Sequence, residues 1–338
     1  MRVEFFCTTA MEVSHYAPIA QALAKLDVDV TFCSPRREQF FGADPPEVID
    51  DEVGKYDLEL RWMRNLDADA VITIQSETFV HDYRGLKMRM IYGVGVTAPA
   101  ENKLDGAAFD YHLVPGPFNQ RIQFDHHPLA SPRLPPERVK VIGYPRLDGW
   151  FVDGETADRL YPPSSLYNPP VLLWLPSWSP ARFASQIFKL ADRFQIWVKP
   201  HHGTVFWEPD DMEVLRAGPC RLIDFTEDPV QSFAAARVVL AELGSGAFTE
   251  AFLLRKPSVA LANPTELSRL LIPHYREHMR IALGPAELPI MIQRATDFGN
   301  NYRDAEALRD DLFESTHGHD GERAARTIIE CINETLPR

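Results

Sequence analysis

Residues 238–254 read VVLAELGSGAFTEAFLL, an apolar run followed by a Gly-Ser-Gly turn and a second apolar stretch with helical spacing. This order predicts a buried strand that passes through a tight turn into a helix. The glycines let the backbone turn sharply, and Ser245 is a residue type that often begins helices. Because ligands of parallel sheets bind outside the carboxyl ends of the strands, the turn is expected at a binding edge.

The same alternation of short apolar runs and helical stretches extends along the whole chain and predicts parallel sheets with crossover helices. Strands are predicted at residues 3–7, 28–33, 70–75, 88–92, 111–114 and 139–142, and again at 171–175, 196–199, 221–224, 238–242 and 258–261. Helices are predicted at residues 16–26, 183–194, 229–236, 247–254 and 321–336, and residues 8–15 are expected to form a loop. The fold class is therefore α/β, with two Rossmann-like domains.

Residues 153–170 are rich in proline and serine and carry few apolar residues at any period, which is typical of a linker. We therefore expect an N-terminal Rossmann-like domain at residues 1–152 and a C-terminal one at residues 171–319. Residues 320–338 should form a terminal helix that returns toward the N-terminal domain.

The chain has 338 residues, with 35 basic and 48 acidic side chains and a net charge of −13. This charge repels nucleic acid backbones, so no nucleic acid partner is expected. No apolar run approaches the roughly 18 residues that span a bilayer, and Glu4 interrupts any signal-peptide core, so a cytoplasmic protein is expected. The four cysteines form no C-x-x-C pair, and neither a metal site nor a cofactor is predicted.

The Gly-Ser-Gly turn is predicted to bind an anion. The helix that follows it leaves backbone N–H groups and the positive end of its dipole at the turn. Ser245 can bond a phosphate oxygen, and Glu250 can accept hydrogen bonds from ribose hydroxyls. The alternative is an ordinary helix cap with an acidic partner, as in a capping box. The candidate donor-binding residues here are Gly244, Ser245, Gly246, Thr249 and Glu250.

Other polar side chains follow the remaining predicted strands. Lys199 and His201 suit a phosphate or diphosphate leaving group, which gains negative charge as it departs, although a plain surface turn is the alternative. Ser177 could line a nucleotide pocket or solvate a loop. Arg146, which follows the last strand of the first domain, is a further candidate for donor binding, and the alternative is that it pairs with Asp148. His15, in the predicted loop, is a candidate catalytic base.

Five segments together resemble, in order, the motif series of the bacterial CDP-glycerol glycerophosphotransferases, which look like GT-B glycosyltransferases: VIGYPRLD (141–148), LLWLPSW (172–178), WVKPH (197–201), LAELGSGAFTEAFLLRKP (240–257) and DGERAAR (320–326). The resemblance implies a GT-B fold with the activated donor held by the C-terminal domain across a cleft. It also implies that Lys199 and His201 hold the donor diphosphate, that Ser245 and Gly246 form the phosphate turn, and that Arg146 is the motif arginine.

The chain departs from that family at two places. It has Tyr92-Gly93 where the family shows His-Gly, and Glu242-Leu243-Gly244-Ser245-Gly246 where the family has an Asp-Tyr-Ser-Ser turn. Its Ser-Gly-Ala-x-x-Glu segment is similar to one of UDP-N-acetylglucosamine 2-epimerases. The expected function is metal-independent transfer of a glycerophosphate or glycosyl group from CDP-glycerol or a nucleotide-sugar to a hydroxyl acceptor in cell-envelope synthesis. The acceptor would be a saccharide or lipid-linked, and the latter would bring the protein to the inner membrane face. The alternatives are an epimerase and a non-catalytic nucleotide-binding protein.

Overall fold

A computed structural model of the protein describes residues 1–34, 44–74, 78–91, 109–121, 135–151, 167–177, 180–225, 227, 229–262, 272, 276, 279–298, 305–314 and 318–336. The chain divides into two compact units, Met1–Gly154 with Asp310–Arg338, and Glu155–Arg309. The sequence had assigned residues 310–319 to the second half. They belong to the first unit because Asp311 pairs with Arg121 and the Phe313 ring packs against Tyr144.

The first unit is built on a parallel sheet with the strand order β3-β2-β1-β4-β5-β6-β7. Its strands are short, and the central ones are buried because both faces are covered. The strands are β1 (Arg2–Phe6), β2 (Asp29–Cys33), β3 (Leu60–Arg61), β4 (Ala70–Thr73), β5 (Leu86–Met90), β6 (Tyr111–Val114) and β7 (Val139–Val141).

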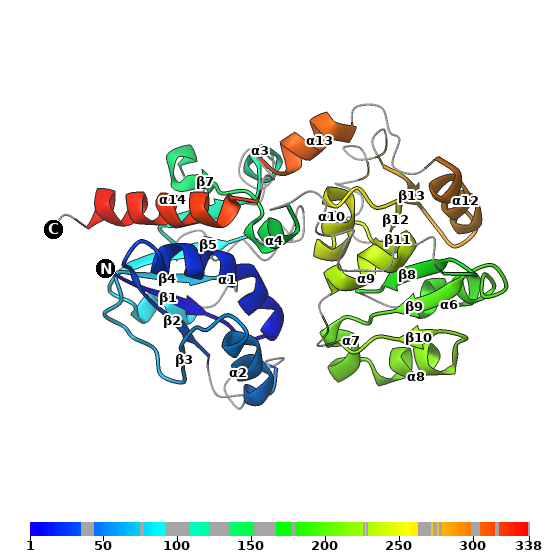
Figure 1. Cartoon of the computed structure of the whole chain (residues 1–338), viewed down its shortest axis with the longest axis horizontal. Coiled ribbons are helices and arrows are strands. Elements are labelled where there is room, and N and C mark those ends of the chain that lie inside the picture. Colours follow the sequence, from blue (N-terminus) through cyan, green and yellow to red (C-terminus); the bar gives the residue numbers. More distant parts are fainter. Residues whose placement is uncertain are drawn as a thin grey trace. The chain divides into compact units, whose positions relative to one another are not determined.

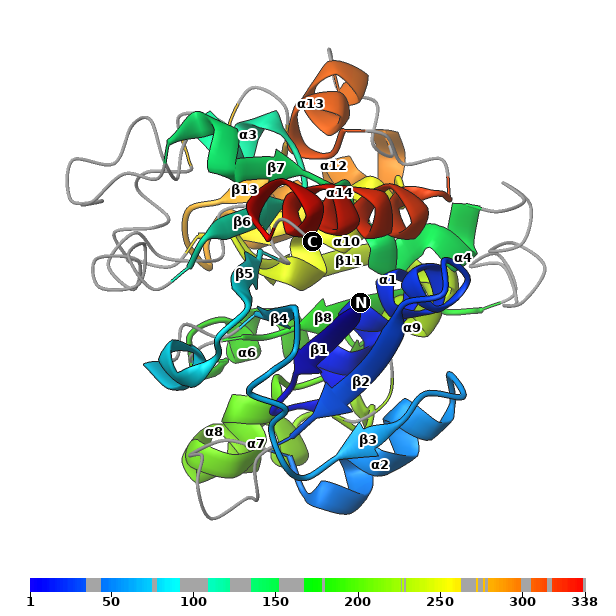
Figure 2. The same cartoon turned by 90° about the vertical axis from the view of Figure 1, so that its left-hand side faces the viewer.

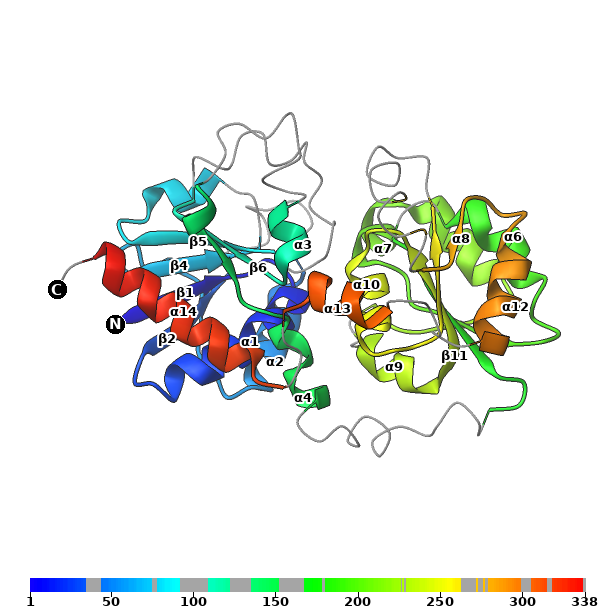
Figure 3. The ribbon, with the colours of Figure 1, turned by 90° about the horizontal axis from the view of Figure 1, so that it is seen from above.

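Helices cover one face of this sheet, where α1 (Ala10–Ala24) and α14 (Asp320–Thr335) lie side by side (Figures 1 and 3). Phe5 of β1 packs there against Tyr16 of α1, and Ile328 of α14 belongs to the same apolar core. The edge strand β3 lies beside α2 in Figure 2. The other helical elements of this unit are α2 (Pro46–Gly54), η2 (Thr78–Asp82), α3 (Pro117–Gln120), η5 (Pro136–Arg138), η6 (Pro145–Leu147) and α4 (Asp148–Phe151).

The start of α1 corrects the expected loop at residues 8–15, because the helix already begins at Ala10. Thr9 accepts a hydrogen bond from the Glu12 amide, and the Glu12 carboxylate accepts one from the Thr9 amide. This reciprocal capping box satisfies N–H groups that the first turn leaves without partners. The Thr-x-x-Glu pattern was present in the sequence and could have moved the predicted helix start.

The second unit has its own parallel sheet, with the strand order β10-β9-β8-β11-β12-β13. Helices α6, α8 and α12 cover one face and α9 and α10 the other (Figure 3). Its strands are β8 (Val171–Leu175), β9 (Gln195–Val198), β10 (Arg221–Leu222), β11 (Ala236–Glu242), β12 (Ser258–Leu261) and β13 (Ile281–Ala282). Its helices are α6 (Ala181–Phe188), α7 (His202–Trp207), α8 (Pro209–Ala217), α9 (Pro229–Ala235), α10 (Gly246–Leu253) and α12 (Leu288–Phe298); the division between the units falls within α13 (Ala305–Leu312).

Candidate functional site

The strand order of the second sheet indicates at which strands, along their carboxyl ends, a ligand is expected. From β8 the chain adds β9 and β10 on one side, and it then returns to place β11 on the other side of β8. Loops that leave β8 and β11 therefore run in opposite directions. Such a topological switch point, at the carboxyl ends of the strands, is where ligands of open α/β sheets bind.

The Gly-Ser-Gly turn lies at this switch point, between β11 and α10. Gly244 has a φ of 91°, a conformation that suits glycine, and Ser245 is the N-cap of α10. The Ser245 hydroxyl accepts a hydrogen bond of 3.1 Å from the Phe248 amide. Gly246 and Ala247 are partly exposed, and their amides are the remaining N–H donors of the first turn. The helix cap considered from the sequence is thus present, and it leaves two amides for an anion.

The acidic partner expected for that cap is absent from the third helical position, which is Phe248, so no capping box forms at α10. Thr249 donates to the Ser245 carbonyl over 3.0 Å, which stabilises the first turn. Thr249 and Glu250 are both buried, and the Glu250 side chain is only 2% exposed. A contact between Glu250 and a ribose therefore stays a prediction.

Glu242 also lies at this edge, and it was not predicted as a site residue. Its carboxylate accepts a hydrogen bond of 2.8 Å from the Ser177 amide, and the residue is 4% exposed. The bond joins the carboxyl end of β11 to the loop after β8, on both sides of the switch point. Only the strand order brings these residues together, although an acid two residues before the Gly-Ser-Gly turn was a visible signal.

Lys199 and His201 follow β9, the strand next to β8. The Lys199 amide donates to the Trp174 carbonyl over 3.0 Å, and the His201 amide donates to the Pro176 carbonyl over 3.1 Å. The segments that follow β8 and β9 therefore stay paired beyond the ends of the strands. The Lys199 ammonium donates to the Phe225 carbonyl over 2.6 Å. His201 Nδ1 accepts from the Gly203 amide over 3.1 Å, so a neutral His201 carries its proton on Nε2. That nitrogen is then a hydrogen-bond donor.

The first unit fills its own switch point, between β1 and β4, with protein groups. The Tyr16 hydroxyl accepts from the Ile74 amide over 2.5 Å and donates to the Phe6 carbonyl over 3.2 Å, which bridges the two strands. At the adjacent start of α1, Asp44 accepts from the Ala10 amide over 2.8 Å. Because Asp44 and Glu12 already place carboxylates at this helix start, it is unsuited to a phosphate.

His15 lies inside α1, not in a loop, and it is 2% exposed. Its Nε2 lies 3.0 Å from Nη1 of Arg146, and its ring meets Tyr144 edge to face. Burial, together with the Arg146 charge, holds the pKa of His15 well below its usual value. The imidazole is therefore neutral, and because arginine can only donate, Nε2 accepts its hydrogen bond. Tyr92 and Gly93, and the stretch up to residue 103, lie outside the described residues.

The VIGYPRLD segment contacts the start of α14. Asp148 accepts hydrogen bonds from the amides of Asp320 and Gly321, over 3.0 and 2.6 Å, and the Asp320 carboxylate accepts from the Tyr144 amide over 2.9 Å. The pairing of Arg146 with Asp148 that we considered is thus wrong, because Asp148 caps α14 and Arg146 contacts His15. Two of the resembling motifs are explained by this packing within the first unit.

Comparisons with known proteins identify the fold. The chain is similar in structure to the UDP-GlcNAc 2-epimerase of Neisseria meningitidis bound to UDP-GlcNAc (TM-score 0.60, 15% identity, 99% of this chain and 100% of that one). It is also similar to HepE of Anabaena in complex with UDP and glucose (TM-score 0.61, 14% identity, 99% and 100%). A third similar structure is the wall teichoic acid polymerase TagF with CDPG (TM-score 0.60, 14% identity, 99% and 90%). The fold is of the GT-B type, as predicted.

No family model and no curated protein sequence matches the chain. Among the described residues, no three or more His, Cys, Asp or Glu side chains are grouped so that they could hold a metal ion. None of the helices in the described part of the chain is both long and apolar enough to cross a membrane.

Proposed function

We propose that the protein is a transferase that takes a nucleotide-diphosphate-activated donor at the switch point of the second unit. The observation that carries this proposal is the first turn of α10, with its partly exposed amides at the carboxyl end of β11, together with Lys199 and His201 on the loop after β9 at the same edge of the sheet. At the switch point of the first unit, the described helix start is that of α1, which already carries the carboxylates of Asp44 and Glu12. The donor diphosphate therefore belongs to the second unit.

The charges at this edge suit a departing nucleotide, which is a nucleoside diphosphate when a glycosyl group leaves a nucleotide-sugar and CMP when glycerophosphate leaves CDP-glycerol. Its phosphate oxygens gain negative charge as the bond to the transferred group breaks, and fixed donors stabilise that charge without reorganising. The amides of Gly246 and Ala247 would bind one phosphate. Lys199 would supply a positive charge, and Nε2 of His201 would donate a hydrogen bond. These groups belong to the protein, so the proposed reaction needs no added metal ion.

The Glu242 carboxylate acts on this site through the backbone. It holds the Ser177 amide and so fixes the loop after β8 against the turn after β11. Because Ser177 lies on that loop, we propose that its hydroxyl faces the nucleotide.

We propose that His15 and Arg146 act as a positioning pair in the first unit, which is expected to bind the acceptor. Nε2 of His15 is already engaged by Arg146, and the low pKa of the imidazole makes it a poor proton acceptor. The base that activates the acceptor hydroxyl is then sought elsewhere, and the stretch from Tyr92 to residue 103 stays the candidate. The acceptor would be a saccharide or a lipid-linked hydroxyl compound.

Donor turnover tests the proposal. CDP-glycerol, UDP-glucose and UDP-GlcNAc are each incubated with the protein and a hydroxyl acceptor, in EDTA, and the released nucleotide is measured. We expect release from one donor, lowered by about two orders of magnitude in K199A and H201A. The matched controls K189A and H81A change exposed side chains of the same types and should keep the wild-type rate. Unchanged release in both K199A and H201A would contradict the assignment.

A UDP-sugar 2-epimerase is the second candidate, favoured by the Ser245-Gly246-Ala247-x-x-Glu250 segment and by the structural similarity to such an enzyme. An epimerase would use the same phosphate site, but it would convert the sugar without transferring it to an acceptor. Product analysis separates the two, since only transfer depends on the acceptor. If CDP-glycerol or a nucleotide-sugar binds without any turnover, the protein is instead a non-catalytic nucleotide-binding protein.

A further inference from the structure

Three large apolar side chains are exposed together on the loop between β3 and β4, at the outside of the first unit (Figure 1). Trp62 is 39% exposed, Met63 81% and Leu66 38%. Single exposed apolar side chains need no explanation, whereas a group of them marks a surface that meets a partner. Residues 62–66 are called the apolar loop below.

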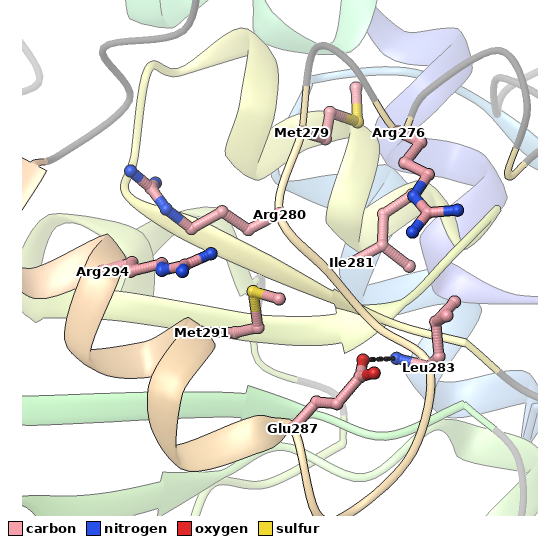
Figure 4. A pocket seen from close by; sticks show the side chains of 8 residues that line it. All are labelled: Arg276, Met279, Arg280, Ile281, Leu283, Glu287, Met291 and Arg294. Carbon is pink, nitrogen blue, oxygen red and sulfur yellow. Dashed lines mark hydrogen bonds between the residues drawn. The ribbon is translucent and has the colours of Figure 1, made fainter.

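The other exposed large apolar side chains are not grouped in this way. Among the described residues they come from separate elements: Leu26, Val214, Leu222, Leu283 and Ile290. Leu283 borders a hollow of about 390 Å³ beside β13, and four of the eight residues that line this hollow are charged (Figure 4). One of them, Glu287, accepts a hydrogen bond of 2.9 Å from the Leu283 amide. The apolar side chains there are thus mixed with polar groups.

A buried carboxylate holds the apolar loop in place. Phe5 packs against α1, so the side chain before it, that of Glu4, points to the opposite face of the sheet. The fully buried Glu4 carboxylate accepts a hydrogen bond of 2.8 Å from the Asn65 amide, and the Tyr83 hydroxyl also donates to it. The loop therefore crosses this face of the sheet at a fixed place and presents its apolar side chains outward.

The charged side chains beside the apolar loop balance one another. They form three ion pairs: Arg61 with Glu59 over 2.8 Å, Arg64 with Asp82 over 3.4 Å and Arg84 with Asp67 over 2.8 Å. These pairs add no net charge to the surroundings of the loop. The net charge of −13 on the whole chain opposes contact with an anionic surface. The loop therefore suits a partner without net charge.

The size of the apolar loop favours a lipid surface over a protein partner. At these exposures the three side chains offer on the order of 300 Å² of apolar surface, whereas each partner in a stable protein interface buries about 800 Å². A bilayer needs no matching shape, and tryptophan is enriched at the boundary between hydrocarbon and headgroups. Zwitterionic headgroups carry balanced charges, as the ion pairs around the loop do.

We propose that the apolar loop docks the protein on a zwitterionic phospholipid surface, with Trp62, Met63 and Leu66 inserted between the headgroups. The inserted area is small, so the binding is weak and reversible. The inference goes beyond the proposed reaction and does not depend on it, although a lipid-linked acceptor would lie in the same surface.

Co-sedimentation with phosphatidylcholine vesicles, in the absence of nucleotides, tests the docking. We expect the wild type to bind, and M63S to lower the partition coefficient about tenfold, because it removes the most exposed of the three apolar side chains. M63L keeps an apolar side chain and should bind like the wild type. The matched control is I290S, which changes an exposed apolar residue of α12 and should leave binding unchanged. Met63 is exposed, so its variants should fold.

Fluorescence locates the contact. Phosphatidylcholine with brominated acyl chains should quench the tryptophan fluorescence of the wild type, and W62F should lose that quenching. Equal binding of the wild type and M63S, or equal weakening by M63S and I290S, would overturn the proposal. So would binding that appears only when phosphatidylglycerol is added, which would make charge the cause. A wild-type dimer that M63S dissociates, without any vesicle binding, would show that a second copy covers the loop instead.

Discussion

Asp148 and Asp320 form a pair of carboxyl groups where the VIGYPRLD segment meets α14. Burial is the main reason that the pKa of Asp320 is raised to about 7, and burial also raises the pKa of Asp148. Backbone amides oppose both shifts by donating to the carboxylates. The junction therefore contains a carboxyl group, that of Asp320, whose protonation changes near neutral pH.

The raised pKa of Asp320 makes the stability of the protein depend on pH. The folded protein binds the proton more tightly than the unfolded chain, so this carboxyl favours folding at low pH and loses that effect as pH rises from about 4 through about 7. D320N removes the titration, and Asn can still accept from the Tyr144 amide. Between pH 5 and pH 8, the free energy of unfolding of D320N relative to wild type should rise by roughly 2–3 kcal/mol.

Urea unfolding of both proteins at pH 5 and pH 8 measures this difference. D148E, which keeps a carboxyl group next to α14, serves as a comparison in which the titration of Asp320 is retained. If the difference in unfolding free energy between D320N and wild type is the same at both pH values, Asp320 does not titrate in this range.

Gly143 is required by the same junction. Its φ is +78°, and a Cβ at this position would overlap the Asp320 carboxyl group. G143A should therefore lower the free energy of unfolding by about 2 kcal/mol or more, through backbone strain and displacement of Asp320. The control is G149A, because nothing lies within 4 Å of a Cβ at Gly149. Equal urea midpoints for G143A and G149A would show that the junction tolerates a side chain.

The residues of the candidate site were predictable to different degrees. Ser177, Lys199 and Ser245 were found because each follows an apolar run, and that local pattern does not depend on the rest of the fold. The bond between Glu242 and Ser177 was not predictable, because it depends on β11 returning to lie beside β8. His15 was misplaced because the capping box at Thr9 and Glu12 was overlooked.

At the scale of elements, buried strands were predictable, whereas the edge strands β3 and β13 were not. The strands at 111–114, 171–175 and 258–261 have the predicted bounds, since each is a mostly apolar run whose residues are all buried. The edge strands β3 and β13 are only two residues long and leave no such pattern. Strand β10, another edge strand, covers only two residues of the predicted 221–224, and both of them are exposed.

The helix predicted at residues 183–194 extends only over Ala181–Phe188, and its remaining residues form turns that lead into β9. Leu190 and Phe194 are nevertheless buried against the same core as Ile187. Helical spacing of apolar residues thus continued past the end of the helix. Periodicity shows which residues face the core more reliably than it shows where a helix ends.

Ser245 has two roles that substitutions at this one position can separate. As the N-cap of α10 it stabilises the unit, so S245A should lower the free energy of unfolding by about 1 kcal/mol. Asp is as good an N-cap as Ser, so S245D should unfold at nearly the wild-type urea concentration. A loss of stability in S245D as large as that in S245A would show that the cap geometry does not accept a carboxylate.

At the scale of the whole molecule, the two units have the same architecture but opposite chemistry at their switch points. In the first unit Tyr16 bridges the strands, and carboxylates of Asp44 and Glu12 occupy the helix start. In the second unit, the helix that begins at the switch point after β11, α10, has a serine cap and partly exposed amides at its start. A net charge of −13 is therefore compatible with an anionic donor, because the attraction is local.

Binding of a nucleoside diphosphate to S245D tests the central claim most directly. The aspartate keeps the helix cap and places a negative charge where the donor phosphate is expected. The wild type is titrated with CDP and UDP by calorimetry, and S245D with whichever binds. We predict binding to the wild type and an affinity at least tenfold lower in S245D, at unchanged folding stability. Equal affinities of the wild type and S245D would contradict the assignment of the diphosphate to the turn at Ser245.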